Sequence, residues 1–446
     1  MKNKLLIIMI FIANFIQAQE NKPLTLKDAI TFALENKADV KKSKLKVINS
    51  DYQIQEVRAR ALPQISANGN LIYNPDIQAS FLDAGSFGGQ PGTVIKAKLG
   101  QAWTSTAGLS LTQTLFDQSV FTGLKAAKST KEFYKINDQL TEEQVIERVA
   151  NAYYQVYVQR QNLIVIDSTL NNTLKIKTIV KTQFENGLAK KIDLDRILVK
   201  LSNISTQRQQ ILNAVMLQEN ALKFYIGMPI EAKINIPNTA FEVSPQVLSE
   251  TPNTTNRTDY LLLKKNEELL QYQKKSILAG YYPTLSLSGN YNFLGQGKKM
   301  PLGSLPSDGV YWSNYSSIGL NLKIPIFTGF GTRAKVRQAE NSLLSIKEDL
   351  KDTKLALDLA YENAKLQIDN SIITIKSQKE NEQLAQEVLD NTKNNYYQGL
   401  TTLTDLLDAE NALTEAQNNY TSAILNYKLA EIQLIKSKGE LKSLLK

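Results

Sequence analysis

The stretch Tyr396-Tyr397-Gln398-Gly399-Leu400 contains the one glycine in the span from Thr332 to Lys438, and that span has no proline. Glycine is the usual residue where an α-helix ends in a reversal, and a long span without glycine or proline favours continuous helix. The sequence therefore predicts two long helices that meet at a tight turn around Gly399. The first half of the chain repeats this pattern, because Gly187 is the one glycine from Leu124 to Ile226, again without proline.

Apolar residues recur three and four positions apart in these spans, which places them along one face of each helix. The series are Val149, Ala152, Val156, Leu163, Ile166 and Leu170; Leu194, Ile197, Leu201, Ile204, Ile211 and Val215; and Leu413, Ala416, Tyr420, Ala423, Tyr427, Ala430 and Leu434. Such series are typical of coiled-coil packing. A helix from about Phe121 to Asn186 would be about 100 Å long at about 1.5 Å per residue. Ordinary globular helices are far shorter, so we favour a tunnel or stalk over an ordinary helical bundle.

The two halves of the chain resemble each other at a nearly constant offset. Ala61-Leu62-Pro63-Gln64-Ile65-Ser66 corresponds to Tyr281-Tyr282-Pro283-Thr284-Leu285-Ser286, and Asn186-Gly187-Leu188 corresponds to Gln398-Gly399-Leu400. A period of about half the chain is too long for a solenoid. We therefore expect two tandem repeats, 19–227 and 257–446, each with a helix, a β-hairpin and a long helical hairpin. The segment 228–256 contains four prolines and is expected to be an irregular connector.

Each half also contains two segments in which apolar and polar residues alternate, which is typical of β-strands. The expected hairpins cover about 64–116 and 284–327, with loops at 74–101 and 295–310. One expected apolar face consists of Ile318, Leu320, Leu322, Ile324 and Ile326. The polar faces carry Ser, Thr and Asn with few charges, and aromatic residues lie near the strand ends. Strands of about ten residues with this pattern fit an outer-membrane β-barrel, and a small water-soluble sheet is the alternative.

The N-terminus has the pattern of a secretory signal peptide. Lys2 and Lys4 precede the apolar run from Leu5 to Ile16, and the small residue Ala18 follows at a suitable cleavage position. We assign 1–18 to this signal. No later stretch is apolar enough for a membrane-spanning helix, so the mature chain would enter a membrane as a β-barrel. Because known barrels start near eight strands, four strands require the chain to oligomerise.

Composition excludes several classes of function. The sequence contains no cysteine and no histidine, which removes thiol nucleophiles, Ser-His-Asp triads, and thiolate or imidazole metal sites. A carboxylate hydrolase has no convergent motif to support it. Lysine and acidic residues are mixed along the chain, so the net charge of +9 indicates solvated helix faces rather than a nucleic-acid patch. We expect no catalysis, no cofactor, no metal site and no nucleic-acid partner.

The tandem halves, the helix-to-strand transitions at Pro63 and Pro283, and the two reversals resemble the TolC-like outer-membrane factor family over essentially the whole mature sequence. The resemblance implies a mainly α-helical fold with a membrane β-barrel. It implies a homotrimer in which a twelve-stranded barrel stands on a twelve-helix periplasmic tunnel. It also implies a location in the outer membrane of a Gram-negative bacterium, in contact with its lipid. The expected partners are a periplasmic adaptor protein and an inner-membrane pump of the RND, ABC or MFS type.

The resemblance assigns an entrance to the second reversal, where Asp405-Leu406-Leu407-Asp408-Ala409 is the most specific motif. Asp405 and Asp408 match residues that form acidic rings at the periplasmic entrance. The equally weighted alternative is that they are helix-start carboxylates favoured by the helix dipole. Tyr396 and Asp193 match a polar link that holds the entrance closed, and a tyrosine packed in a coiled-coil seam is the alternative.

The resemblance also assigns docking on the adaptor to the two tips, Gly187-Leu188 and Gly399-Leu400. A leucine that closes its own helix cap is the alternative for each tip. Thr401 departs from the family, which often has an arginine at this position. Because threonine cannot make a bidentate link, the departure puts a second gate contact in doubt.

The leading functional hypothesis is a passive exit duct of a tripartite efflux system, with energy supplied by the inner-membrane pump. A type I secretion duct for polypeptides has the same fold, and the sequence does not separate the two. The alternative from another class is a periplasmic coiled-coil adaptor or structural stalk. Adaptors typically have one helical hairpin between β-rich flanks, whereas this chain has two halves that each carry an amphipathic β-hairpin.

Overall fold

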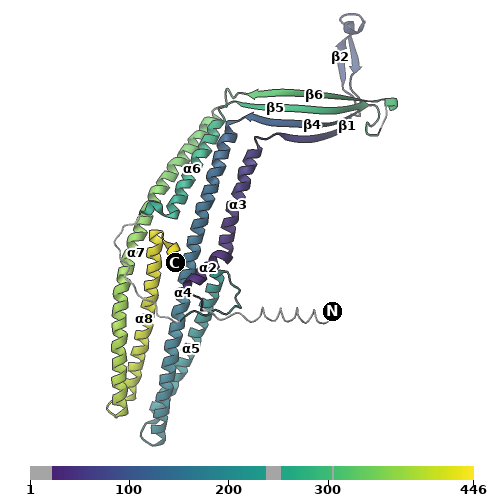
Figure 1. Cartoon of the computed structure of the whole chain (residues 1–446). Coiled ribbons are helices and arrows are strands. Elements are labelled where there is room, and N and C mark those ends of the chain that lie inside the picture. The colour runs from purple at the N-terminus through teal and green to yellow at the C-terminus, as the bar shows by residue number, and fades with distance from the viewer. Residues whose placement is uncertain (1–22, 238–252, 304–305, 446) are drawn as a thin grey trace, which may run out of the picture. The chain divides into compact units, whose positions relative to one another are not determined.

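The computed structural model of the chain describes residues 23–237, 253–303 and 306–445 (Figure 1). The expected signal peptide at 1–18 lies outside these residues, as does most of the expected connector. The chain divides into two compact units. The helical unit falls within Met1–Val47, Phe133–Lys264 and Glu348–Lys446, and the sheet unit is Ile48–Glu132 and Lys265–Lys347.

Long helices dominate the described chain. The two helical hairpins are α4 (Gln118–Glu185) with α5 (Lys191–Ile226), and α7 (Gly331–Tyr397) with α8 (Leu403–Lys438). The other α-helices are α2 (Leu26–Asn36), α3 (Ala38–Ala59) and α6 (Thr258–Ala279), with 3-10 turns at Ala84–Phe87, Thr254–Asn256, Pro306–Asp308 and Leu441–Leu445. With 68 and 67 residues, α4 and α7 are each about 100 Å long. Neither helix contains proline, and apart from Gly123 near the start of α4 neither has an internal glycine, which permits this length.

The apolar series predicted from the sequence form the core of the helical unit. In α4, Val149, Val156 and Ile166 are at most 2% exposed, and in α8 the side chains of Tyr427 and Leu434 are 1% exposed. The largest cluster joins α2, α4, α5 and α8, and a second cluster near the reversals joins α4, α5, α7 and α8. Each such side chain contributes about 1.5–3 kcal/mol relative to an exposed one. The predicted apolar faces of these helices are therefore buried, and their packing as coiled-coil seams stays a prediction.

The sheet unit contains one antiparallel sheet built from both halves of the sequence. Its strands are β1 (Gln64–Tyr73), β4 (Trp103–Phe116), β5 (Thr284–Gly297) and β6 (Val310–Lys323), in the order β1-β4-β5-β6. The pairing of β4 with β5 joins the two hairpins, with Leu109 opposite Tyr291. Within the described residues, β1 and β6 each pair on one side only, so both edges of this sheet are open.

Two details of the predicted strands are wrong. The segment 74–101 is not simply a loop, because β2 (Ala79–Asp83) and β3 (Val94–Lys98) form a separate two-stranded hairpin inside it. The predicted apolar face also ran too far, since β6 ends at Lys323 and leaves Ile324 and Ile326 outside the strand. Pro325 explains this end, because proline cannot donate a hydrogen bond to a sheet.

No helix within the described part of the chain is sufficiently long and apolar to cross a lipid bilayer.

Candidate functional site

The two helical reversals lie in the helical unit and have the same backbone construction. Gly187 and Gly399 have φ angles of 77° and 73°, a left-handed conformation that favours glycine. The Leu188 N–H donates to the Gln183 carbonyl at 2.7 Å, and the Leu400 N–H donates to the Asn395 carbonyl at 2.8 Å. These bonds satisfy carbonyls at the ends of α4 and α7, which is how a helix closes before a tight turn.

The leucine at each tip projects into solvent. The side chain of Leu188 is 81% exposed and that of Leu400 is 72% exposed. A leucine that closed its own helix cap would instead be packed against the preceding turn. Both leucines are therefore available to a partner, and docking of an adaptor on them stays a prediction.

Asp405 is built into the start of α8. Thr402 and Asp405 form a reciprocal capping box, in which the Thr402 N–H donates to Asp405 Oδ2 at 2.9 Å. The hydroxyls of Thr402 and Thr401 donate to the same oxygen at 2.6 and 2.8 Å. These hydrogen bonds, those from Thr402 first, hold the pKa of Asp405 below its ordinary value. Thr401, the departure from the family pattern, thus strengthens a cap.

Asp408 has a different environment one turn further along α8. Its side chain is exposed, and it has no hydrogen-bond or ion-pair partner within the described residues. Asp405 therefore has the helix-start role that the sequence analysis gave as the alternative to an acidic ring. Asp408 is the freer carboxylate, and the acidic ring expected of both residues needs neighbouring chains.

Tyr396 links the two helical hairpins within one chain. Its hydroxyl donates to Gln183 Oε1 of α4 at 3.2 Å. Burial, followed by the nearby charge of Asp193, raises the pKa of Tyr396. The Asp193 carboxylate itself lies 3.8 Å from Arg196 Nη1, and Arg196 also donates to Thr404 of α8 at 3.0 Å. The direct Tyr396–Asp193 link remains a prediction.

Sequence reasoning missed Gln183 and Arg196 as contacts between the hairpins. The one indication for Gln183 is its position four residues before Gly187, on the last turn of α4. Exposed amides are common in helices, however, so position alone does not single it out.

A buried ion pair joins the hairpins further along the helices. Lys200 Nζ of α5 lies 3.0 Å from Glu410 Oε2 of α8, and the Thr173 hydroxyl donates to the same oxygen at 3.3 Å. The side chains of Lys200 and Glu410 are 13% and 4% exposed. Lys200 also donates to the Leu407 carbonyl at 3.2 Å. Charges this deeply buried require partners, and here each satisfies the other.

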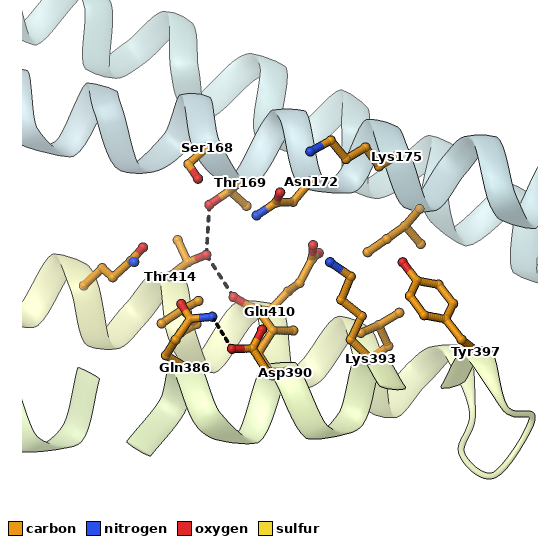
Figure 2. A pocket seen from close by; sticks show the side chains of 15 residues that line it. Ser168, Thr169, Asn172, Lys175, Gln386, Asp390, Lys393, Tyr397, Glu410 and Thr414 are labelled. Atoms are coloured by element: carbon orange, nitrogen blue, oxygen red, sulfur yellow. Dashed lines mark hydrogen bonds between the residues drawn. The ribbon is translucent and has the colours of Figure 1, made fainter. Parts of the chain in front are cut away.

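A polar cavity of about 180 Å³ lies beside this ion pair, between α4 and the α7–α8 hairpin (Figure 2). Thr169 and Thr414 face each other across it at 3.1 Å, and Gln386 donates to Asp390 at 3.0 Å. The interface between hairpins is therefore mixed at this level, because Ile176, Leu389, Leu406 and Leu413 of the apolar cluster near the reversals also line the cavity. A polar, incompletely filled interface adheres less strongly than an apolar one of the same area.

The family model described as "Outer membrane efflux protein" matches residues 29–228 and 256–440. The chain is 24% identical over 351 residues to the outer membrane protein TolC of Vibrio cholerae, covering 75% of this chain and 77% of that protein. It is 24% identical over 342 residues to the alkaline protease secretion protein AprF of Pseudomonas aeruginosa, covering 73% and 68%.

A solved structure has the same fold. The outer membrane protein VceC of Vibrio cholerae superposes with a TM-score of 0.71 at 17% identity, covering 93% of this chain and 96% of that chain. The alignment therefore includes most of both halves of the chain.

Proposed function

This chain belongs to the outer membrane efflux protein family, and from that premise we propose that three copies of it form one closed channel. The chain is an outer-membrane exit duct of an efflux or secretion system. In the proposed trimer, each copy gives four strands to a twelve-stranded β-barrel in the outer membrane. Each copy also gives α4, α5, α7 and α8 to a twelve-helix tunnel in the periplasm.

The open sheet is the observation that carries the proposal that several copies close one barrel. β1 and β6 present unpaired backbone groups along their outer edges. Such groups cost several kcal/mol each in a lipid core, so a membrane sheet has to close on itself. Four strands are too few for closure by one chain. Pairing of β1 with β6 of the next copy removes both edges at once.

An uncovered apolar stripe on α7 supports the same assembly. Its members are Leu344, Leu355, Leu359, Leu366, Ile373 and Leu384, each at least 60% exposed in the single chain. Their separations of 4, 7 and 11 residues keep them on one face of the helix. A neighbouring copy would cover this stripe as coiled coils cover theirs.

The proposed partners are a periplasmic adaptor protein and an inner-membrane pump. In this proposal the pump supplies the energy, and no cofactor or nucleic acid takes part. The adaptor would meet the exposed Leu188 and Leu400 at the tips. At the entrance, we assign Asp405 and Asp408 to acidic rings and Tyr396 with Asp193 to a closing link.

Efflux of small molecules and secretion of polypeptides both fit the duct. AprF is named for protease secretion, and its identity to this chain, 24%, equals that of the Vibrio cholerae TolC. Because the pump selects the cargo, we assign the exit step alone and leave both cargo classes within the proposal.

The trimer is tested by fractionating membranes from cells that make the full-length chain and measuring the mass of the detergent-extracted protein. We expect the protein in the outer-membrane fraction, with three times the mass of one mature chain. A water-soluble monomer would contradict the proposal and return the molecule to the class of periplasmic stalk proteins.

A further inference from the structure

The two tips occupy equivalent positions but differ in charge. At the offset of 212 residues that relates Gly187 to Gly399, Lys190 and Lys191 stand where the second tip has Thr402 and Leu403. The two tips therefore differ in sequence where the second helix of each hairpin begins. Leu403 is 5% exposed in the second tip, whereas Lys191 is exposed in the first.

The two lysines weaken the start of the helix that they occupy. Lys190 is the N-cap residue of α5 and makes no capping hydrogen bond through its side chain, whereas Thr402 caps α8 with a complete capping box. Positive charge is also unfavourable at a helix N-terminus, where the helix dipole is positive. Two local rules are broken at one tip and obeyed at the other, which indicates that the lysines serve a purpose other than folding.

The lysine charges are not neutralised inside the chain. Lys190 and Lys191 are exposed and have no hydrogen-bond or ion-pair partner among the described residues. Of the acidic groups nearby, Glu185 lies 3.7 Å from Lys181 and Asp193 lies 3.8 Å from Arg196. The exposed Asp195 makes no ion pair with either lysine among the described residues.

Apolar side chains flank the two lysines. Leu188 is 81% exposed and Ile192 is 56% exposed. We call Leu188, Lys190, Lys191 and Ile192 the basic tip. A surface of this composition can bind a partner that offers both apolar contacts and carboxylates.

We propose that the basic tip binds an acidic, partly apolar helical surface on the periplasmic adaptor, and that the Leu400 tip binds a second surface of that protein without excess carboxylate. This inference rests on the proposed function, because it names the chemistry of the partner at the docking tips. The charge difference between the tips then determines the register in which the adaptor binds. The six tips of a trimer alternate in charge, and an adaptor with matching charge binds in one register rather than two.

The test uses the full-length chain in the outer membrane of its own host, with a photo-reactive amino acid at Leu188 or at Leu400. We expect the adduct from position 188 to map to a helical segment of a periplasmic protein that carries at least two Asp or Glu side chains. We expect the adduct from position 400 to map to the same protein at a site without such a cluster.

Charge reversal measures the contribution of the lysines. Lys190→Glu with Lys191→Glu should lower the yield of the position 188 adduct about tenfold, because like charges then face each other. Lys376→Glu with Lys379→Glu is the matched control, since both lysines are exposed on α7 and have no partner in the described chain. Changing the mapped carboxylates of the partner to lysine should restore the yield in the charge-reversed variant alone.

The variant itself should fold normally. Carboxylates at the start of α5 are favoured by the helix dipole, so the melting temperature of the helices should not fall. Lys190→Gln with Lys191→Gln is a second variant that removes charge without reversing it, and it should give an intermediate yield.

Several outcomes would overturn the inference. These are an unchanged yield after charge reversal, an equal loss in the α7 control, adducts only with lipid or cell-wall material, or no adduct from position 188. Planar-bilayer conductance of the same purified protein separates this failure from failure of the proposed function. Channel steps without the expected adduct reject the basic tip alone, whereas a protein without channel steps rejects the duct.

Discussion

At the residue scale, the two aspartates of the second tip have separate tasks. The Asp405 carboxylate is bound by Thr401 and Thr402 at the start of α8, and the Asp408 carboxylate is free to face ions. In the proposed trimer, both carboxylates would contribute negative charge at the entrance, and Asp408 would be the one free to bind ions directly. A ring of carboxylates attracts cations and raises their local concentration.

We predict that Asp408→Asn weakens block of single-channel current by divalent cations, raising the half-blocking concentration about tenfold. Asp405→Ala with Asp408→Ala should weaken block at least as much. Planar-bilayer recording with stepwise addition of the cation gives the half-blocking concentration. Unchanged block in the double variant would remove the ring assignment from both residues.

The cap at Asp405 predicts a dependence of local stability on pH. Its pKa is lowered in the folded chain by hydrogen bonds from Thr402 and Thr401, so folding favours the charged carboxylate. The stabilisation is complete above the ordinary aspartate pKa of about 3.9 and is lost as the pH falls through the lowered value. Hydrogen exchange at the first turn of α8 should accelerate over this range. In Asp405→Asn the acceleration should be absent, and an identical profile in both proteins would refute the cap.

The positive φ at the second tip predicts the cost of a methyl group. Gly399→Ala should destabilise the tip by about 1–2 kcal/mol, because an L-residue is strained in this conformation. The matched control is Gly331→Ala at the start of α7, where φ is not positive and an added Cβ meets no atom within 4 Å. Hydrogen exchange of the last turn of α7 measures the difference. Equal behaviour of the two variants would contradict the strained turn.

At the element scale, polar contacts join the hairpins at several levels. Tyr396 bonds to Gln183 near the tips, and Lys200 pairs with Glu410 beyond them. The cavity between α4 and the α7–α8 hairpin reduces apolar contact at the same level. These polar contacts supplement the apolar clusters that join the hairpins.

We predict that Tyr396→Phe raises the conductance of the isolated channel, because the ring stays packed while the bond to Gln183 is lost. Tyr397→Phe is the control, since Tyr397 is 49% exposed and has no hydrogen-bond partner in the described chain. Single-channel current at low salt compares the three proteins. If Tyr396→Phe conducts like the parent, the tyrosine is a packing residue and not part of a gate.

The buried ion pair predicts a non-additive effect on stability. Lys200→Met leaves Glu410 buried without its partner and should cost about 3–5 kcal/mol, seen as earlier thermal unfolding of the helices. Adding Glu410→Leu should recover most of this loss, because no unpaired charge then remains buried. A double variant as unstable as the single one would show that the pair contributes through packing instead.

The elements were largely predictable from the sequence, for physical reasons that differ between helix and strand. Heptad series and isolated glycines specify long helices and their ends locally, so α4, α5, α7 and α8 follow directly. The β2–β3 hairpin was missed because its surroundings carry several glycines and Pro91, which favour turns. The end of β6 was misplaced because alternation continued past Pro325.

The candidate site was predictable only in part. The tips and the Asp405 cap follow from residue spacing, since glycine and capping residues act on their own helices. Gln183 and the Lys200–Glu410 pair join helices far apart in sequence, and no local pattern records which polar residues will meet. The sequence also did not predict that the two aspartates differ, because residue spacing does not show that Thr401 and Thr402 donate to Asp405 and not to Asp408.

At the scale of the whole molecule, the single chain leaves two kinds of surface without a partner. The sheet has open edges at β1 and β6, and α7 carries an uncovered apolar stripe. Each feature is costly for one chain and is removed by neighbours of the same kind. The sequence indicates this need through its four strands, but the number of copies comes from the family resemblance and not from the pattern itself.

The central claim is that these chains together make a water-filled passage through a membrane. Its most direct test is planar-bilayer conductance of the purified, detergent-extracted protein, with the mass of the assembly measured in the same preparation. We predict discrete current steps from a particle with three times the mass of the mature chain. A particle of any mass that inserts without current steps, or a water-soluble protein that does not insert, would contradict the account.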